Sequence, residues 1–296
     1  MAITLGNAPC SWGVEFAGDS RNPSWQTVLR QCAEAGYKGI ELGPVGFLPE
    51  EPTVLRDHLA MHDLALTAGV VYQPFHDSAK WQDVMEIAKR TCQSLHAHDA
   101  KHLVIIDAIS PRRARTAGRC HAAEMMDETE WQSFLRHIKD VAILAKEEYG
   151  LTPSIHPHAG GFIDFLPDIE RLLDAVDADT LKICIDTGHS VYAGFDPIDF
   201  IEQHSDRIDY IHLKSTHAVT RERVIAHSIG FYEACAEGVF CRLSAGEVNF
   251  KKLHQTLVDI GYAGWCTVEQ DCDPELAVDP MADARENRIY LQSVGF

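Results

Sequence analysis

The chain has 296 residues, 46% of them hydrophobic, and a formal net charge of −18. This length and apolar content predict one large core, and they fit a single domain over residues 1–296 better than two. A chain this acidic repels nucleic-acid phosphates and anionic membrane surfaces. Neither is therefore expected as a partner, whereas a neutral small molecule remains compatible with the charge.

The sequence shows no sign of export or of membrane insertion. No apolar run approaches the roughly 18 residues of a membrane span, and the N-terminus lacks the basic and hydrophobic regions of a signal peptide. The nine cysteines are scattered and include no C-x-x-C pair. We therefore expect reduced thiols and a cytoplasmic location.

Eight apolar segments rich in β-branched residues alternate with segments of helical periodicity. The predicted strands cover residues 3–9, 38–42, 64–72, 101–107, 151–156, 181–186, 208–212 and 264–269. The predicted helices cover residues 24–36, 53–62, 81–97, 127–149, 167–176, 197–204, 221–237, 250–260 and 280–291. This alternation predicts an α/β fold with a parallel sheet, which at this length is a single (β/α)8 TIM barrel.

Two connections are longer than a barrel requires. Residues 215–249 separate the seventh and eighth strands, and an excursion of this length at the barrel mouth is typical of a lid or a partner-contact segment. The loop after the fourth strand contains four arginines, at positions 112, 113, 115 and 119. They can form an anion site, but we favour a solvated run of charge.

Metal-competent side chains end four strands in the second half of the chain. These residues are His156, Asp186, His212 and Glu269. A barrel of parallel strands brings all strand C-termini to one face, so the four side chains are expected to meet around one cation. Two imidazoles and two carboxylates without a thiolate favour Mn²⁺ or Co²⁺, with Mg²⁺ and catalytic Zn²⁺ left open.

Each candidate also has a structural alternative when taken singly. Asp186 can act as the N-cap of a helix that begins in Asp-Thr-Gly-His, and Glu269 can be a solvated carboxylate on the barrel rim. Glu41 lies near the C-terminal end of the second predicted strand and is equally well explained as a site residue or as a rim charge. Four such residues at the ends of four consecutive strands nevertheless favour a shared site.

Several runs resemble the xylose-isomerase-like TIM-barrel superfamily, and within it the inosose dehydratase branch. The resemblance covers essentially the whole chain and is carried by residues 8–14, 36–44, 186–189, 212–214, 238–241 and 264–271. Asp-Thr-Gly-His at 186–189 and His-Leu-Lys at 212–214 are similar to motifs shared across the superfamily. The first two runs and the last resemble the branch more specifically.

The resemblance implies a ligand set and a reaction. It assigns Asp186, His212 and Glu269 to the metal, and His156 to the first position, where the isomerases carry a glutamate. Losing that glutamate removes half of the pair that moves a proton in isomerases and epimerases. The implied activity is therefore a divalent-metal-dependent hydro-lyase that dehydrates a cyclic keto-polyol through a metal-stabilised enediolate.

Further residues are candidates for catalysis or substrate binding. The acid and the base are expected among four side chains, between which the sequence does not decide: His158, His189, Lys214 and Glu41. Trp12 in the first loop can form a pocket wall. Asp107 at the end of the fourth strand and Arg242 in the long connection are further candidates for contacting a polyol or sugar substrate.

Other functions compete with this interpretation. A sugar isomerase or epimerase and a lyase acting on 3-keto-glycosides would use the same metal-enediolate chemistry. An abasic-site endonuclease of the same superfamily is disfavoured by the acidic charge and by Glu41 and Tyr72, which stand where it needs histidines. A non-catalytic barrel would require one of the four ligands to be non-functional, and a homo-oligomer is left open.

Overall fold

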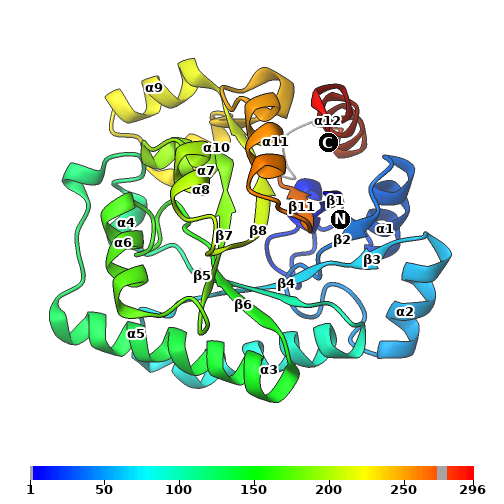
Figure 1. The fold of residues 1–296 in the computed structure, drawn as a ribbon, viewed down its shortest axis with the longest axis horizontal. Coiled ribbons are helices and arrows are strands. Elements are labelled where there is room, and N and C mark those ends of the chain that lie inside the picture. The colour runs from blue at the N-terminus through cyan, green and yellow to red at the C-terminus, as the bar shows by residue number, and fades with distance from the viewer. Residues whose placement is uncertain (1–2, 272–278) are drawn as a thin grey trace.

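The computed structural model describes residues 3–271 and 279–296 as a curved parallel sheet enclosed by helices (Figure 1). The sheet consists of β1 (Thr4–Asn7), β2 (Gly39–Ile40), β3 (Ala65–Leu66), β4 (Ala68–Gln73), β5 (His102–Asp107), β6 (Thr152–Ile155), β7 (Lys182–Asp186), β8 (Ile208–Leu213) and β11 (Trp265–Val268). The strands pair in the order β3-β2-β1-β11-β8-β7-β6-β5-β4.

The barrel closes through the segment that was predicted as the third strand. Thr67 divides this segment into β3, which pairs with β2, and β4, which pairs with β5. The amide of Thr67 donates to Ile40, so one continuous stretch of chain joins both edges of the sheet. The predicted (β/α)8 barrel is therefore confirmed, with nine short strands where eight segments were expected.

Helices pack around the sheet in chain order. They are α1 (Trp25–Glu34), α2 (Pro52–Met61), α3 (Trp81–Ala97), α5 (Glu128–Ile143), α6 (Leu166–Ala175), α8 (Pro197–Gln203), α11 (Phe250–Asp259) and α12 (Pro280–Val294). Ser24 caps α1 by accepting a hydrogen bond from the Thr27 amide. Asp127 and Glu130 form a reciprocal capping box at the start of α5, which fixes where this helix begins.

Alternation along the strands separates two apolar regions. Ile105, Ile183 and Ile211 face outward and belong to the main core between the sheet and the helices. Cys184 and Tyr210 belong to a smaller cluster with Ala68, Val104 and Ile106. Because successive side chains on a strand point to opposite faces, this smaller cluster fills the inside of the barrel.

The 215–249 connection differs from its predicted form. It contains β9 (Ser215–Thr216), α9 (Ala218–Ala226), α10 (Phe231–Ala236), β10 (Phe240–Cys241) and a 3-10 turn at Leu243–Ala245. The single helix predicted over 221–237 is wrong, because Ser228 adopts a left-handed conformation with φ of 56° and Gly230 caps a new helix. Strands β9 and β10 pair antiparallel and hold the connection together.

The loop after β5 is also more ordered than the sequence suggested. It contains the short helix α4 (Pro111–Ala114) and a 3-10 turn at Cys120–Ala122. The prediction that its arginines form a solvated charge run is wrong for Arg113, which is buried. The Arg113 guanidinium donates to Asp168 at 2.5 Å and to the Glu124 carbonyl at 3.0 Å, so it ties this loop to α6.

Within the described residues, no helix is long and apolar enough to cross a membrane.

Candidate metal centre

Four side chains converge at the C-terminal end of the barrel. His156 follows β6 directly, Asp186 ends β7, His212 lies in β8 and Glu269 follows β11. Asp186 pairs with His212 in the sheet register, and His212 pairs with Thr267. One ligand atom from each of the four residues lies within 4.8 Å of the others, and all four side chains are buried.

Several of these buried atoms lack a hydrogen bond within the described residues. They are both ring nitrogens of His156, Oδ2 of Asp186 and Nδ1 of His212. They lie close to other members of the set: His156 Nε2 is 3.7 Å from Asp186 Oδ2, and His212 Nδ1 is 3.3 Å from Glu269 Oε2. Asp186 Oδ2 also lies 3.3 Å from the ammonium of Lys214. Leaving a buried polar group unpaired costs about 1–3 kcal/mol, so the arrangement is consistent with a cation that all four residues bind.

Asp186 combines the two interpretations that its sequence context allowed. Its Oδ1 accepts hydrogen bonds from the amides of Gly188 and His189, at 2.7 and 2.8 Å, and so caps α7 (Thr187–Ala193). Its Oδ2 remains directed at the other ligands. The helix N-terminus therefore fixes one oxygen and leaves the other available to a cation.

Glu41 lies behind His212. Its Oε1 is 2.9 Å from His212 Nε2, and the carboxyl is only 1% exposed, so Glu41 is not a solvated rim charge. A hydrogen bond from Nε2 to the carboxylate leaves Nδ1, the nitrogen without a partner, as the one that faces the other ligands. A carboxylate that fixes the tautomer of an imidazole in this way is typical of the surroundings of metal ligands.

Burial and neighbouring charges set the ionisation of the centre. Burial acts to raise the pKa of Glu269, but His212 and Lys214 outweigh it and hold that pKa well below its ordinary value. Burial acts to lower the pKa of Lys214, but Asp186, Asp271 and Glu269 outweigh it and hold the pKa well above its ordinary value. Glu269 is thus ionised, the state in which a carboxylate binds a cation.

Lys214 lies beside the ligands and bridges to three carboxylates. Its Nζ is 3.3 Å from Asp186, 3.1 Å from Glu269 and 3.0 Å from Asp271. It is also 3.1 Å from Nε2 of His189. The side chain is fully buried, so this ammonium is positioned rather than solvated.

His189 and His158 form the opposite wall of the site. Burial is the main cause that lowers the pKa of both rings, to about 3 for His158 and well below its ordinary value for His189, so both are neutral. The Ala159 amide lies 3.3 Å from His189 Nδ1, opposite Lys214. The Ala159 amide and the Lys214 ammonium are both hydrogen-bond donors. A neutral imidazole accepts a hydrogen bond at only one of its nitrogens, so these two groups compete for His189.

Aromatic rings from the 215–249 connection cover these histidines. The rings of His158 and His189 lie 4.0 Å apart between centroids. Phe231 lies 5.5 Å from His158, Phe240 lies 5.0 Å from His189, and the Lys214 Nζ is 5.1 Å from the Phe240 ring. The connection therefore contacts the site directly and shields it from water.

A family model described as xylose isomerase-like TIM barrel matches residues 29–294 of the chain. The chain belongs to this family. An inosose dehydratase of Geobacillus kaustophilus is 26% identical over 293 residues, which cover 97% of this chain and 93% of that protein.

Solved structures share the fold of this xylose isomerase-like barrel at low identity. The probable 3-DHS dehydratase AsbF of Bacillus anthracis superposes with a TM-score of 0.74 at 18% identity, and the match covers 98% of both chains. A structure of the IolI protein that holds a zinc atom gives a TM-score of 0.74 at 15% identity and covers 99% of both chains. These likenesses support the fold alone.

The three residues proposed to contact substrate have protein partners in this member of the family. The Trp12 indole donates to Gln31 at 2.7 Å and is buried in the main core. The carboxylate of Asp107 accepts from the amides of His76 and Phe162, which ties two loops together. The guanidinium of Arg242 pairs with Asp283 and Glu286 on α12. Their contact with substrate stays a prediction.

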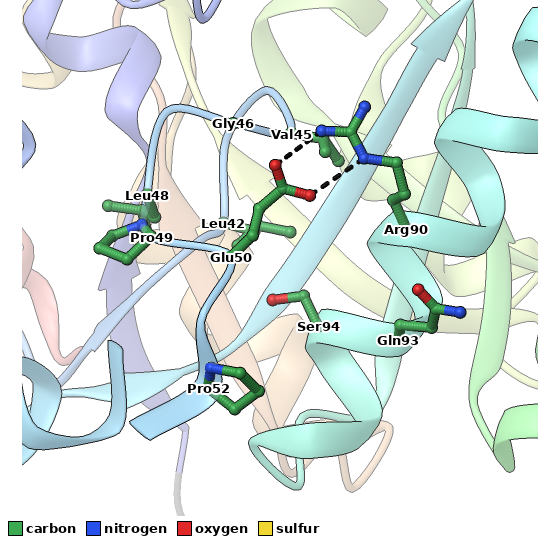
Figure 2. A pocket seen from close by; sticks show the side chains of 10 residues that line it. All are labelled: Leu42, Val45, Gly46, Leu48, Pro49, Glu50, Pro52, Arg90, Gln93 and Ser94. Carbon is green, nitrogen blue, oxygen red and sulfur yellow. Dashed lines mark hydrogen bonds and ion pairs between the residues drawn. The ribbon is translucent and has the colours of Figure 1, made fainter. Parts of the chain in front are cut away.

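A separate cavity lies between the loop after β2 and helix α3 (Figure 2). It has a volume of about 180 Å³ and an apolar wall formed by Leu42, Val45 and Leu48. Across it, the guanidinium of Arg90 binds Glu50 through two hydrogen bonds of 3.0 and 2.7 Å. This pairing neutralises the cation, and none of the metal-competent residues lines the cavity.

Two residues of the centre were not predicted as site residues. Asp271, in the run that contains Glu269, is a partner of Lys214, and its position two residues after Glu269 on the same face was the available signal. Cys184 was expected only as one of the reduced thiols, yet its sulfur lies within 4.8 Å of nitrogens of His156 and His212. Burial raises the pKa of this thiol to about 12, so it is neutral.

Proposed function

We propose that this protein is a divalent-metal-dependent hydro-lyase that dehydrates a neutral cyclic keto-polyol such as an inosose. The observation that carries the proposal is the pairing of Lys214 with His189, 3.1 Å apart, beside four metal-competent side chains. Relatives named inosose dehydratase that match nearly the whole chain support an enzyme of this kind. A cytoplasmic location and a small-molecule substrate belong to the same proposal.

His156, Asp186, His212 and Glu269 would hold the ion, and their unpartnered buried atoms fit this role. A bound Mn²⁺ or Co²⁺, or a Zn²⁺, would polarise the substrate carbonyl and so acidify the neighbouring C–H bond. Glu41 has a different part from the other catalytic candidates. It touches His212 and is inferred to position that ring rather than to contact substrate.

Elimination of water needs a base for the proton next to the ketone and an acid for the hydroxyl one carbon further. We assign these parts to neutral His189 and charged Lys214. His189 takes the α-proton, the electron pair of the C–H bond forms a C=C bond, and the β-hydroxyl leaves as water with a proton from Lys214. His189 can then return its proton to Lys214 across their contact, which restores both groups.

His158 is placed to contact the substrate. Its Nδ1 donates to the Ala159 carbonyl at 2.9 Å, which leaves Nε2 as an acceptor. The ring centroid of His158 lies 4.0 Å from that of His189 and 5.7 Å from that of Tyr72. A hydroxyl of the polyol can donate to this nitrogen, so we propose that His158 orients the ring of the substrate.

The charge of the site favours a substrate without a phosphate or carboxylate. Asp186, Glu269 and Asp271 face the ammonium of Lys214, and the carboxyl of Glu41 lies behind His212. Their four negative charges exceed those of the ammonium and a divalent ion together, so an anionic substrate would be repelled.

Product analysis tests the proposal. The metal-free protein is loaded with Mn²⁺ or Co²⁺ and incubated with a panel of inososes, 3-keto-glucosides and free ketoses. We expect loss of one water from an inosose by mass spectrometry, together with a new ultraviolet absorption. EDTA-treated protein and the Lys214→Met variant are the controls.

Other outcomes would assign a different function. A product of unchanged mass would show an isomerase or epimerase, in which the proton moves but the hydroxyl stays. Elimination from 3-keto-glucosides but from no inosose would show a lyase that acts on 3-keto-glycosides. Full activity after removal of divalent ions would contradict the role of the metal centre.

A further inference from the structure

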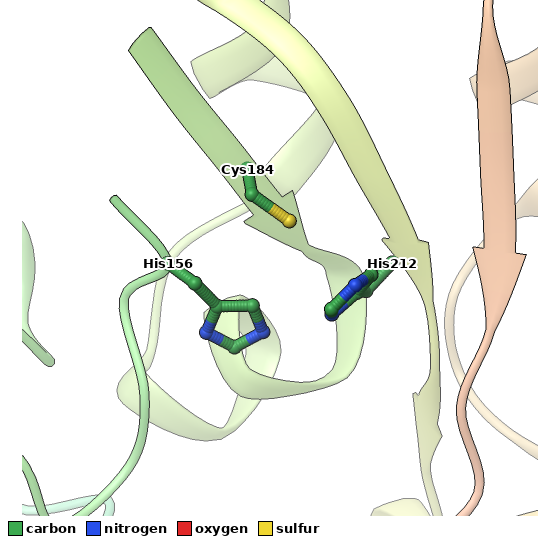
Figure 3. Close-up of side chains that lie close together, drawn as sticks. All are labelled: His156, Cys184 and His212. Carbon is green, nitrogen blue, oxygen red and sulfur yellow. The ribbon is translucent and has the colours of Figure 1, made fainter. Parts of the chain in front are cut away.

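Cys184 lies one layer deeper in the barrel than the proposed catalytic ligands. It precedes Asp186 by two residues on β7, and strand alternation therefore turns both side chains to the inside. The thiol is fully buried and packs among Ala68, Val104, Ile106 and Tyr210. Figure 3 shows its sulfur directed toward the rings of His156 and His212.

The geometry brings three donor atoms of two types, one sulfur and two imidazole nitrogens, into one small volume. The Cys184 sulfur and one nitrogen from each of His156 and His212 lie within 4.8 Å of one another. Neither ring nitrogen of His156 has a hydrogen bond within the described part of the chain, and the same holds for His212 Nδ1. These two imidazoles are therefore free to serve a cation on either side of them, toward the carboxylates or toward the thiol.

We propose that His156, Cys184 and His212 form a second site, for a soft, thiophilic divalent ion such as Cd²⁺. This site shares both histidines with the oxygen-rich set that contains Asp186 and Glu269, so the two sites exclude each other. On binding, a bond from sulfur to the ion replaces the S–H bond, and the proton passes to water. This inference concerns binding and does not depend on the reaction proposed above.

The chemistry of the donors separates the two sites. Carboxylate oxygens suit Mn²⁺ and Mg²⁺, whereas a thiolate with imidazoles selects softer ions. A hard ion should therefore occupy the set with Asp186 and Glu269, and a soft ion should occupy the set with Cys184. A structural consequence follows: the deeper ion lies away from Lys214 and His189, so it would occupy the histidines without activating a substrate.

Cadmium titration of the metal-free, full-length protein tests the proposal. A sulfur-to-cadmium bond gives an ultraviolet charge-transfer absorption that needs no substrate. We expect this absorption to saturate at one Cd²⁺ per chain in the wild-type protein. It should be lost in Cys184→Ala and retained in Cys266→Ala, which removes an equally buried cysteine from β11 that faces the outer core.

Competition with Mn²⁺ tests the overlap of the two sites. Mn²⁺ bound to the protein is followed by electron paramagnetic resonance, and equimolar Cd²⁺ should release it from the wild-type protein. Cys184→Ala should still bind Mn²⁺, which also shows that this variant is folded, and it should need at least about tenfold more Cd²⁺ for the same release. Should Cys184→Ala fail to fold, Cys184→Ser replaces it.

Three results would overturn the inference. They are the absence of the absorption in the wild-type protein, its persistence in the Cys184 variants, and simultaneous binding of Cd²⁺ and Mn²⁺. None of these results bears on whether an inosose is dehydrated. Conversely, a protein inactive toward every polyol can still show the cadmium absorption, so the two proposals fail separately.

Discussion

The barrel holds polar side chains at two levels, and they differ in how completely they are paired. The lower level, which we call the base layer, comprises Thr67, His102, Ser154, Asp209, Tyr210 and Thr267. His102 Nδ1 lies 2.7 Å from Asp209, which also accepts from Ser154 at 3.3 Å. The Tyr210 hydroxyl contacts Thr67 at 2.9 Å and Thr267 at 2.5 Å.

At the upper level, the candidate metal centre leaves atoms of His156, Asp186 and His212 without hydrogen bonds within the described residues. Thr67, Ser154, Tyr210 and Thr267 of the base layer are as buried as the upper residues, and only His102 and Asp209 are partly exposed, so solvent does not explain why the buried hydroxyls are paired. Satisfied polar networks rigidify a core, whereas unsatisfied ones cost about 1–3 kcal/mol per group unless a ligand pairs them. The comparison therefore assigns stability to the base layer and ligand binding to the upper level.

The largest expected effect comes from changing an upper ligand without disturbing the fold. In Asp186→Asn, the side-chain oxygen can still cap α7, but Oδ2, which lies 3.3 Å from Lys214 Nζ, becomes an amide that cannot neutralise a cation. We expect Mn²⁺ affinity and turnover to fall by about 10³-fold, with thermal stability nearly unchanged. Isothermal titration calorimetry, steady-state rates and circular dichroism measure the three quantities.

The matched control is Asp196→Asn, which changes a cap of the same type at the start of α8. It should leave both Mn²⁺ affinity and turnover as they are. Equal losses in the two variants would mean that helix capping, and not the second oxygen of Asp186, accounts for the effect.

A smaller effect is expected from the residue behind a ligand. Glu41→Gln keeps the size of the side chain but weakens the charged hydrogen bond to His212 Nε2. Partners of metal-bound histidines typically contribute 10- to 100-fold to metal affinity, so we expect a loss of about that size. If Glu41 acted as a catalytic base instead, turnover at saturating Mn²⁺ would fall steeply while Mn²⁺ affinity stayed unchanged.

The same comparison shows what sequence could predict. The strand ends and the ligand candidates at 156, 186, 212 and 269 follow from local periodicity, since parallel strands share one polar end. Asp209 was not predictable as a base-layer residue. It enters through an irregularity in β8, where Ile183 pairs with Ile208 but Cys184 pairs with Tyr210. One extra residue on a strand changes which face a side chain occupies.

Long-range partners were equally out of reach. The burial of Arg113 depends on Asp168 on a separate helix, and the tie between Glu41 and His212 spans most of the chain. The sequence suggests an exposed charge at Arg113 and leaves the role of Glu41 undecided, and only the closed barrel supplies their partners. The break in the 221–237 helix depends on a left-handed Ser228, a conformation that serine seldom adopts.

In the base layer, a change should affect stability and not function. Asp209→Asn weakens the pair with His102 and the contact with Ser154. Because a hydrogen bond to a charged group contributes about 1.5–3 kcal/mol, we expect the free energy of unfolding in urea to fall by roughly this amount. Mn²⁺ affinity should stay within about twofold, and a tenfold loss would show that the two levels are coupled.

The smallest effect is expected from Tyr210, the base-layer residue beside His212. Changing it tests whether the base layer and the upper level act independently. Tyr210 is 5.6 Å from His212 between ring centroids, yet its hydroxyl is bound to threonines and not to the ligand. Tyr210→Phe should lower the free energy of unfolding by about 1 kcal/mol, because Thr67 and Thr267 lose a partner. Combining it with Thr267→Val should cost less than the two separate changes together, since both sides of one hydrogen bond are then removed. Urea unfolding of the wild-type protein, the two single variants and the double variant measures this coupling. Mn²⁺ titration of the same four proteins should show an unchanged Mn²⁺ affinity. A weaker Mn²⁺ affinity in Tyr210→Phe would mean that the base layer also holds His212 in place.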